Sequence, residues 1–219
     1  MRSEADIEAF VEAFLMEEPL AFEFEDLYPE VAVAVRTAYE MLDTGLEAQE
    51  EYKGRVCREG CYRCCSDPVL VSPPQGLLVA LSVDPDGFRA RYKEWEAKVD
   101  RASYFRALHE KDEAANVEDI DKANDLEERA VQAYGKGEAV FCPFLDEGTC
   151  SIYELRPDAC RTFFSISRDC EPYYFRITGL IPSFEMFFAY LSIAIDDFKG
   201  GLLPVVVNRM LNYGQDCVE

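Results

Sequence analysis

The chain has 219 residues, of which 49% are hydrophobic, so it is long and apolar enough to fold as one domain around a full core. Its 22 Lys and Arg residues against 43 Asp and Glu residues give a formal net charge of −21. Because phosphate backbones and anionic lipid surfaces repel such a chain, we expect it to bind neither nucleic acid nor a membrane surface. Its single histidine, His109, excludes His-rich metal sites and most His-dependent catalysis.

Whether the nine cysteines form disulfides depends on the redox state of the compartment that holds the protein. The first residues show neither the basic nor the apolar region of a secretory signal. The longest apolar stretch, 181–195, is interrupted by Pro182 and Glu185 and is too short to cross a bilayer. The sequence therefore predicts a cytoplasmic protein with reduced thiols, for which metal ligation or thiol chemistry is the better interpretation.

The N-terminal part of the chain predicts two amphipathic helices. Ser3 and Asp6 form a capping box at the start of the first helix. The apolar residues of this helix recur at helical spacing: Ile7, Phe10, Val11, Phe14 and Leu15. The second helix is expected to begin after Pro29 and to present Val31, Val35, Tyr39 and Leu42 on one face.

A short strand is predicted at 69–71, followed by a helix that Ser72 caps and that buries Leu77, Leu78 and Leu81. Residues 86–137 are highly charged and helical in character, with 109–125 as an exposed connection and His109 as an exposed helical residue. Two apolar stripes run through this region: Phe88, Tyr92, Trp95 and Val99, then Leu126, Ala130 and Val131.

Near the C-terminus, residues 184–198 are apolar on nearly every side and predict a buried helix. Gly200 and Gly201 interrupt the pattern, and 202–211 predict a last short helix. The segments 55–66 and 139–161 are irregular and carry most of the cysteines. We therefore predict a mainly α fold: a single domain, 1–219, of irregular helical architecture around two cysteine loops, with at most a few short strands.

Seven cysteines form two blocks with short internal spacings. The first block is Cys57, Cys61, Cys64 and Cys65, and the second is Cys142, Cys150 and Cys160. Closely spaced thiols can converge on one metal ion, and two such loops can together complete a tetrahedral sulfur shell. Such a shell suits zinc or an iron–sulfur cluster. The Cys-x3-Cys-x2-Cys spacing slightly favours an iron–sulfur cluster, and zinc is the alternative.

Positive charge accompanies these cysteines in an otherwise acidic chain. Lys53, Arg55, Arg58 and Arg63 surround the first block, against only Glu59. Arg156 and Arg161 flank Cys160 and are candidate donors to metal-bound thiolates, because a guanidinium keeps its charge and offers several N–H groups. Pairing with surface carboxylates is the alternative role for these cations.

These residues also carry a resemblance to a known family. The strings CREGCYRCC at 57–65, CPFL at 142–145 and CSIYELRPDACR at 150–161 closely resemble the YkgJ-type cysteine-cluster family, whose members are described as zinc- or iron-chelating domains. Flagellin lysine N-methylases have a related cysteine pattern. The resemblance covers about 55–165, with 86–137 as a helical insertion between helical flanks, and it implies that the seven clustered cysteines are the metal ligands.

Cys170 and Cys217 lie outside the two blocks and are interpreted as thiols without a metal. The residues leave three classes of function open. The chain is a metal-binding module, an enzyme whose cluster supports methyl transfer or redox chemistry, or an interaction protein with a structural zinc whose acidic helices dock on a basic protein partner.

Overall fold

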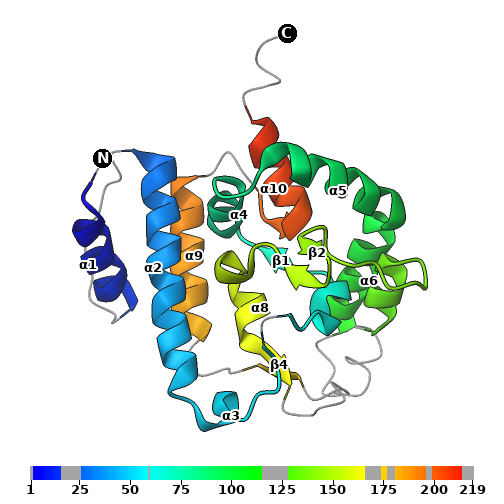
Figure 1. Cartoon of the computed structure of the whole chain (residues 1–219), viewed down its shortest axis with the longest axis horizontal. Helices are drawn as coiled ribbons and strands as arrows, with labels where there is room; N and C mark the ends of the chain where they lie inside the picture. Colours follow the sequence, from blue (N-terminus) through cyan, green and yellow to red (C-terminus); the bar gives the residue numbers. More distant parts are fainter. Residues whose placement is uncertain are drawn as a thin grey trace. The chain divides into compact units, whose positions relative to one another are not determined.

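The computed structural model describes residues 2–15, 26–58, 60–114, 128–165, 174–176, 181–195 and 199–213 (Figure 1). Contacts between residues divide the chain into two compact units. The first unit comprises Met1–Cys61, Val69–Pro85 and Ile152–Glu219, and the second comprises Tyr62–Pro68 and Asp86–Ser151. The longer segment of the second unit thus begins at Asp86, the first residue of the predicted insertion. Helices predominate in both units, which confirms the predicted mainly α class.

The first unit is built around the long helix α2. Its helices are α1 (Glu4–Leu15), α2 (Leu27–Glu47), α3 (Glu50–Lys53), α4 (Pro73–Ala80), η2 (Tyr153–Leu155), α8 (Asp158–Thr162), α9 (Ile181–Ala194) and α10 (Leu203–Asn212). Helix α2 packs against α1, α4, α8 and α9, and α4 also packs against α10 (Figure 1). Aromatic side chains fill the space between these helices: Phe10 contacts Phe187, and Tyr39 contacts Phe188.

Two strand pairs complete the first unit, and both are antiparallel. In one, β1 (Leu70–Val71) pairs with β6 (Gly201–Leu202), with Leu70 opposite Leu202. In the other, β4 (Phe163–Ser165) pairs with β5 (Tyr174–Arg176), with Phe164 opposite Phe175. The strands are therefore few and short, as the sequence predicts.

The second unit surrounds an aromatic core. Its elements are η1 (Arg63–Ser66), α5 (Pro85–Lys98), α6 (Arg101–Ala114), a helical segment at 128–134, β2 (Leu145–Asp146) and β3 (Thr149–Cys150). The ring of Phe88 stacks on that of Phe144, with centroids 4.9 Å apart. Buried Trp95 donates its indole N–H to the Tyr134 hydroxyl at 2.7 Å. This core fixes the 140–151 segment, which carries two of the clustered cysteines, against α5.

Local sequence signals explain where several helices begin. The backbone N–H of Asp6 donates to Ser3 Oγ at 3.2 Å, and the N–H of Ser3 donates to the Asp6 carboxylate at 3.3 Å. The predicted capping box of the first helix is therefore confirmed. At α4, the Ser72 N–H donates to Gln75 Oε1 at 3.0 Å. Ser72 is therefore the N-cap of this helix, as predicted.

Four sequence expectations are wrong in detail. Helix α2 begins at Leu27, before Pro29 and not after it. The first turn of a helix tolerates proline because the backbone N–H groups of that turn have no partner within the helix. Residues 109–114 extend α6 and are not a connection, although His109 is exposed as expected. Leu81 follows α4 and is exposed. Helix α9 is not buried all round: Met186 and Ile193 are 61% and 76% exposed.

Some expectations fall on residues outside the described part, namely Leu126, 115–125 and 196–198. No helix among the described residues is long and apolar enough to cross a membrane.

Candidate metal centre

Cys57 lies beside strand β4 in the first unit. The Val56 N–H donates to the Ser165 carbonyl at 2.8 Å, and the Ser165 N–H donates to Cys57 Sγ at 3.2 Å. These two bonds fasten the start of the first cysteine block to the strand that directly follows α8. Cys57 is therefore held beside β4 by one hydrogen bond at the backbone of Val56 and one at its own sulfur atom.

A turn separates Cys57 from Cys61. The Cys61 N–H donates to the Arg58 carbonyl at 2.9 Å, and Gly60 adopts a φ of +83°. A residue with a side chain rarely adopts this left-handed conformation, whereas glycine does so at little cost. Gly60 thus allows three residues to fit between the two cysteines in a tight turn.

The remaining cysteines of the first block lie on η1 in the second unit. The Cys65 carbonyl accepts a hydrogen bond from the Cys142 N–H at 2.7 Å, which places these two cysteines side by side at the backbone. A side-chain hydrogen bond with Cys65, reinforced by burial, raises the pKa of the Cys64 thiol above its ordinary value. Cys64 and Cys65 are therefore neighbours at their side chains as well as along the chain.

The β2–β3 hairpin presents Cys150 opposite Leu145. Its turn residues, Glu147 and Gly148, both have positive φ values, of 47° and 81°. This is the pattern of a type I′ turn, whose twist matches that of a two-stranded hairpin. The Leu145 N–H also donates to the Cys142 carbonyl at 2.9 Å, so the segment from Cys142 to Cys150 is closely folded.

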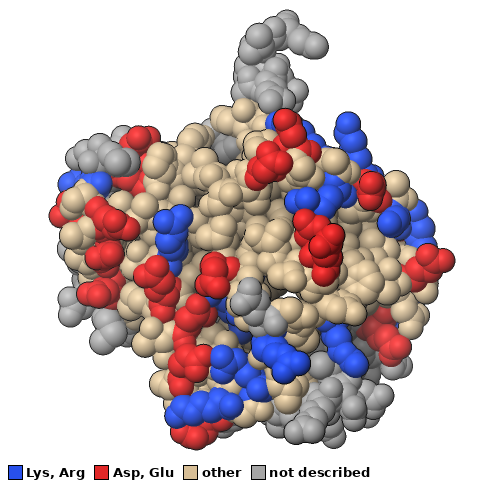
Figure 2. Space-filling view, viewed as in Figure 1, with Lys and Arg blue, Asp and Glu red and all other residues tan. Residues whose placement is uncertain are grey.

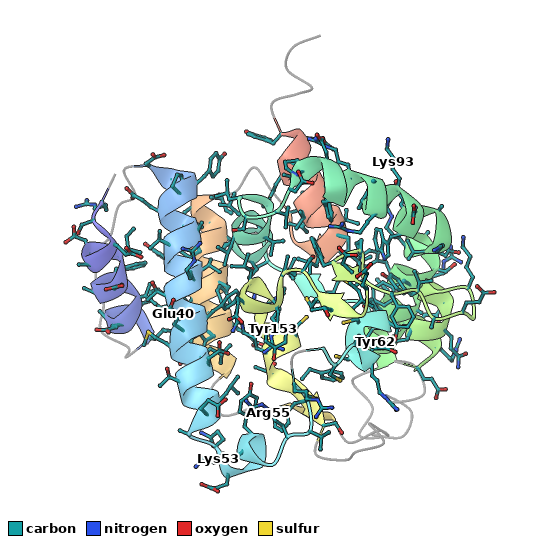
Figure 3. All side chains as sticks on the ribbon, viewed as in Figure 1. Glu40, Lys53, Arg55, Tyr62, Lys93 and Tyr153 are labelled. Carbon is teal, nitrogen blue, oxygen red and sulfur yellow. The ribbon has the colours of Figure 1, made fainter. Side chains whose placement is uncertain are left out.

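Two exposed aromatic rings flank the cysteines of the second unit. Tyr62, labelled in Figure 3, is 46% exposed, and Phe141 is 44% exposed. Their rings meet edge to face with centroids 6.1 Å apart. A Cβ atom added at Gly148 would lie 3.8 Å from the Tyr62 ring, so this ring also covers the hairpin turn. The pair connects the residue before Cys142 with the residue after Cys61.

Cys160 lies in the middle of α8, in the first unit. Its N–H donates to the Pro157 carbonyl at 2.9 Å. Arg161, the next residue, is only 4% exposed, and its guanidinium binds the Asp43 carboxylate on α2 and the backbone carbonyls of Arg156 and Glu154. The hydrogen bonds made by the Arg161 side chain therefore go to oxygen atoms.

Arg156 is placed differently. Its guanidinium lies over the ring of Tyr153, which Figure 3 labels, with the guanidinium carbon 3.8 Å from the ring centroid. Its Nε–H is buried and meets no acceptor among the described residues. A buried donor without an acceptor is costly, so this position suits an acceptor such as a metal-bound thiolate.

Two of the cations near the first block, Lys53 and Arg55, have acidic partners. Lys53 pairs with Glu50 and Arg55 with Glu47, each at 2.6 Å. Figure 3 labels both cations, and Figure 2 shows blue and red side chains together over α3 and the end of α2. For Lys53 and Arg55, pairing with surface carboxylates is thus the role that the structure shows.

The donor set fits a soft metal ion by its chemistry, because sulfur ligands suit zinc and iron–sulfur clusters. All seven clustered cysteines are partly exposed, and no disulfide joins any two of them. In the part of the chain that the structure describes, no three His, Cys, Asp or Glu side chains lie close enough together to hold a metal ion. Metal binding by thiolates is coupled to folding, so coordination would order the segments that carry these thiols.

Two residues around Cys160, Gln75 and Asp43, are not predicted by the sequence analysis. Gln75 donates from Nε2 to the Asp158 carboxylate at 2.5 Å, and Asp43 binds Arg161. The Ser72-x-x-Gln75 spacing, that of a capping box, could have identified Gln75. No sequence signal identifies Asp43, which is 118 residues from Arg161. Cys170 and Cys217 lie outside the described residues.

The cysteine-bearing part of the chain matches a known protein family. Residues 56–175, more than half of the chain, match the family named CxxCxxCC, described as a putative zinc- or iron-chelating domain. Searches of curated proteins and of solved structures found no match. The match spans all seven clustered cysteines, although this chain has three residues between Cys57 and Cys61 where the family name has two. The chain therefore belongs to the CxxCxxCC family.

Proposed function

We propose that this protein holds an iron–sulfur cluster or zinc through cysteine thiolates drawn from Cys57, Cys61, Cys64, Cys65, Cys142, Cys150 and Cys160. The observation that carries the proposal is the donor set itself: seven partly exposed thiols, unlinked by disulfides, on segments that backbone hydrogen bonds hold in place. Thiols in such numbers fit metal ligation better than packing, since buried structural cysteines are usually inert and enclosed. When bound, the metal would supply a cross-link between the cysteine-bearing segments.

Arg156 and Arg161 belong to the same proposal as positive charges that offset the negative charge of the thiolates. The support for Arg156 is its buried Nε–H, which has no acceptor among the described residues. The support for Arg161 is its place next to Cys160 in an almost fully buried position. Thiolate shells around zinc or iron carry net negative charge, and nearby donors stabilise them.

Anaerobic purification followed by elemental analysis and an absorption spectrum tests the proposal. An iron–sulfur cluster gives iron, acid-labile sulfide and a broad visible absorption, whereas a zinc site gives zinc and no visible colour. The proposal is wrong if the protein, purified anaerobically, contains neither metal in stoichiometric amount and takes up neither on reconstitution.

The Cys61→Ser variant tests the ligand assignment. We expect it to lose metal and to melt about 2–8 °C below the wild type, because a loss of about 1–2 kcal/mol lowers Tm by this amount in a chain of this length. Cys217→Ser is the matched control, since Cys217 lies outside the family match and should keep the wild-type metal content. Equal metal content and equal Tm for Cys61→Ser and the wild type would remove Cys61 from the ligand set.

A further inference from the structure

Cys160 is carried by a helix too short to be stable by itself. Helix α8 spans the five residues Asp158–Thr162, little more than one turn. Helices of this length are unstable in isolation, because nucleation costs more than one or two hydrogen bonds return. The position of Cys160 therefore depends on contacts between α8 and other elements of the first unit.

The first such contact joins the C-terminal half of α8 to α2. The Arg161 guanidinium binds the Asp43 carboxylate and lies over the ring of Tyr39, with its carbon atom 4.5 Å from the ring centroid. Its Nε–H donates to the Arg156 carbonyl at 2.8 Å. Asp43 and Tyr39 are one turn apart on α2, so a single face of this long helix holds one end of α8.

The second contact joins the N-terminal end of α8 to α4. Gln75, which is 3% exposed, donates from Nε2 to Asp158 Oδ1 at 2.5 Å. The Oε1 atom of the same side chain accepts from the Ser72 N–H at 3.0 Å, which fixes the orientation of the amide. Asp158 also accepts from the Ala159 N–H at 2.8 Å. Both ends of α8 are thus tied to a larger helix, and Cys160 lies between the two ties.

We infer that Asp43 and Gln75 are positioning residues that hold Cys160 in place as a metal ligand. The inference rests on the proposed function, because it presupposes that Cys160 binds the metal. Neither side chain needs to touch the metal: Asp43 acts through Arg161, and Gln75 acts through Asp158. Partners that orient a ligand in this indirect way typically change metal affinity by about 10- to 100-fold when they are removed.

A double-mutant cycle with Co²⁺ as the probe tests the inference. Asp43→Asn should weaken Co²⁺ binding by at least about tenfold. The double variant Asp43→Asn/Cys160→Ser should bind Co²⁺ no more weakly than Cys160→Ser alone. Once the Cys160 thiol has been removed, Asp43 has no ligand left to position. Glu96→Gln is the matched control: it breaks the exposed 3.2 Å pair between Glu96 and Arg101, and its effect should be negligible.

The thiolate-to-cobalt charge-transfer absorption provides a readout that a purely structural role would not change. At saturating Co²⁺, the absorption per bound ion in Asp43→Asn should fall to the level of Cys160→Ser. Gln75→Glu provides a second variant if Asp43→Asn does not fold, because it keeps the acceptor for Ser72 and removes the donor to Asp158. It should give the same reduced absorption.

The outcomes separate the two proposals. If the wild type binds neither Co²⁺ nor, on anaerobic reconstitution, iron, or if Cys160→Ser binds the metal as tightly as the wild type, the assignment of Cys160 as a ligand fails and the inference fails with it. If Cys160→Ser weakens binding but the effects of Asp43→Asn and Cys160→Ser simply add, only the positioning role is overturned. A wild-type charge-transfer band in both Asp43→Asn and Gln75→Glu would also overturn it.

Discussion

The carboxylate of Asp100 accepts two hydrogen bonds where α6 begins. The Ser103 N–H donates to it at 3.0 Å and the Ser103 hydroxyl at 2.9 Å. Asp100 therefore occupies the N-cap position, where an acidic side chain satisfies N–H groups of the first turn. The hydrogen bond from the Ser103 N–H, followed by that from its hydroxyl, lowers the pKa of Asp100 below its ordinary value of 3.8.

This lowered pKa predicts how the stabilising effect of Asp100 depends on pH. A carboxyl group that loses its proton more readily in the folded state stabilises the fold above its unfolded pKa, and loses that effect as the pH falls through the folded pKa. We expect the difference in free energy of unfolding between the wild type and Asp100→Asn to be largest near about pH 7 and to shrink below about pH 4. Urea unfolding of both proteins across this range measures the difference.

Ser103→Ala provides the control for this prediction, because it removes the hydroxyl donor. In the Ser103→Ala background, the Asp100→Asn substitution should show a weaker dependence on pH. A difference that stays constant from pH 7 to about pH 3 would mean that the cap does not shift the pKa of Asp100.

Close packing of α4 against α10 depends on the absence of a side chain at Gly76. A Cβ atom at this position would lie 2.3 Å from Cγ1 of Val206, far inside normal contact distance. Val206 is buried, and its β-branched side chain has little rotational freedom within a helix. The two helices could therefore accept a methyl group only by moving apart.

We expect Gly76→Ala to destabilise the protein by about 1–3 kcal/mol, the usual cost of overpacking a core. Val206→Ala alone should also destabilise, because it leaves a cavity. The double variant should be less destabilised than the sum of the two single variants, since the new methyl group occupies the space that Val206 gives up. Denaturant unfolding of the three variants measures this coupling, and strictly additive free energies would contradict the predicted clash.

The elements differ in how well the sequence predicts them. Helices with regular apolar spacing or a clear cap, such as α1 and α4, follow from local residues alone. The exposed face of α9 does not, because an apolar surface says nothing about which neighbours cover it. At the candidate site, cysteine spacing identifies the thiols, but Gln75 and Asp43 interact with residues 83 and 118 positions away. Such long-range pairs are set by helix packing, which a local sequence pattern does not encode.

At the scale of the whole molecule, the net charge of −21 dominates long-range interactions. The local excess of cations around the first cysteine block is reduced by the pairing of Lys53 with Glu50 and of Arg55 with Glu47. On the face that Figure 2 presents, acidic side chains lie in several clusters with basic side chains between them. The net charge of the chain would thus repel an approaching polyanion at long range.

We therefore expect no measurable binding to duplex DNA or single-stranded RNA at physiological ionic strength. Binding to nucleic acid depends mainly on cations that displace counterions from phosphates, and in this chain 43 acidic residues outnumber the 22 Lys and Arg residues. Fluorescence anisotropy with labelled oligonucleotides provides the measurement. A Kd in the micromolar range that weakens with added salt would show that the basic segment around the first cysteine block acts independently of the net charge.

The hydrogen bond between Trp95 and Tyr134 has a further, optical consequence. Trp95 is the single tryptophan of the chain and lies in the core of the second unit, so intrinsic emission reports the surroundings of one known side chain. Far-ultraviolet circular dichroism reports the helices of both units together. Coincident midpoints of the two signals during denaturation would indicate one cooperative transition, whereas an earlier or later emission change would show the second unit unfolding separately.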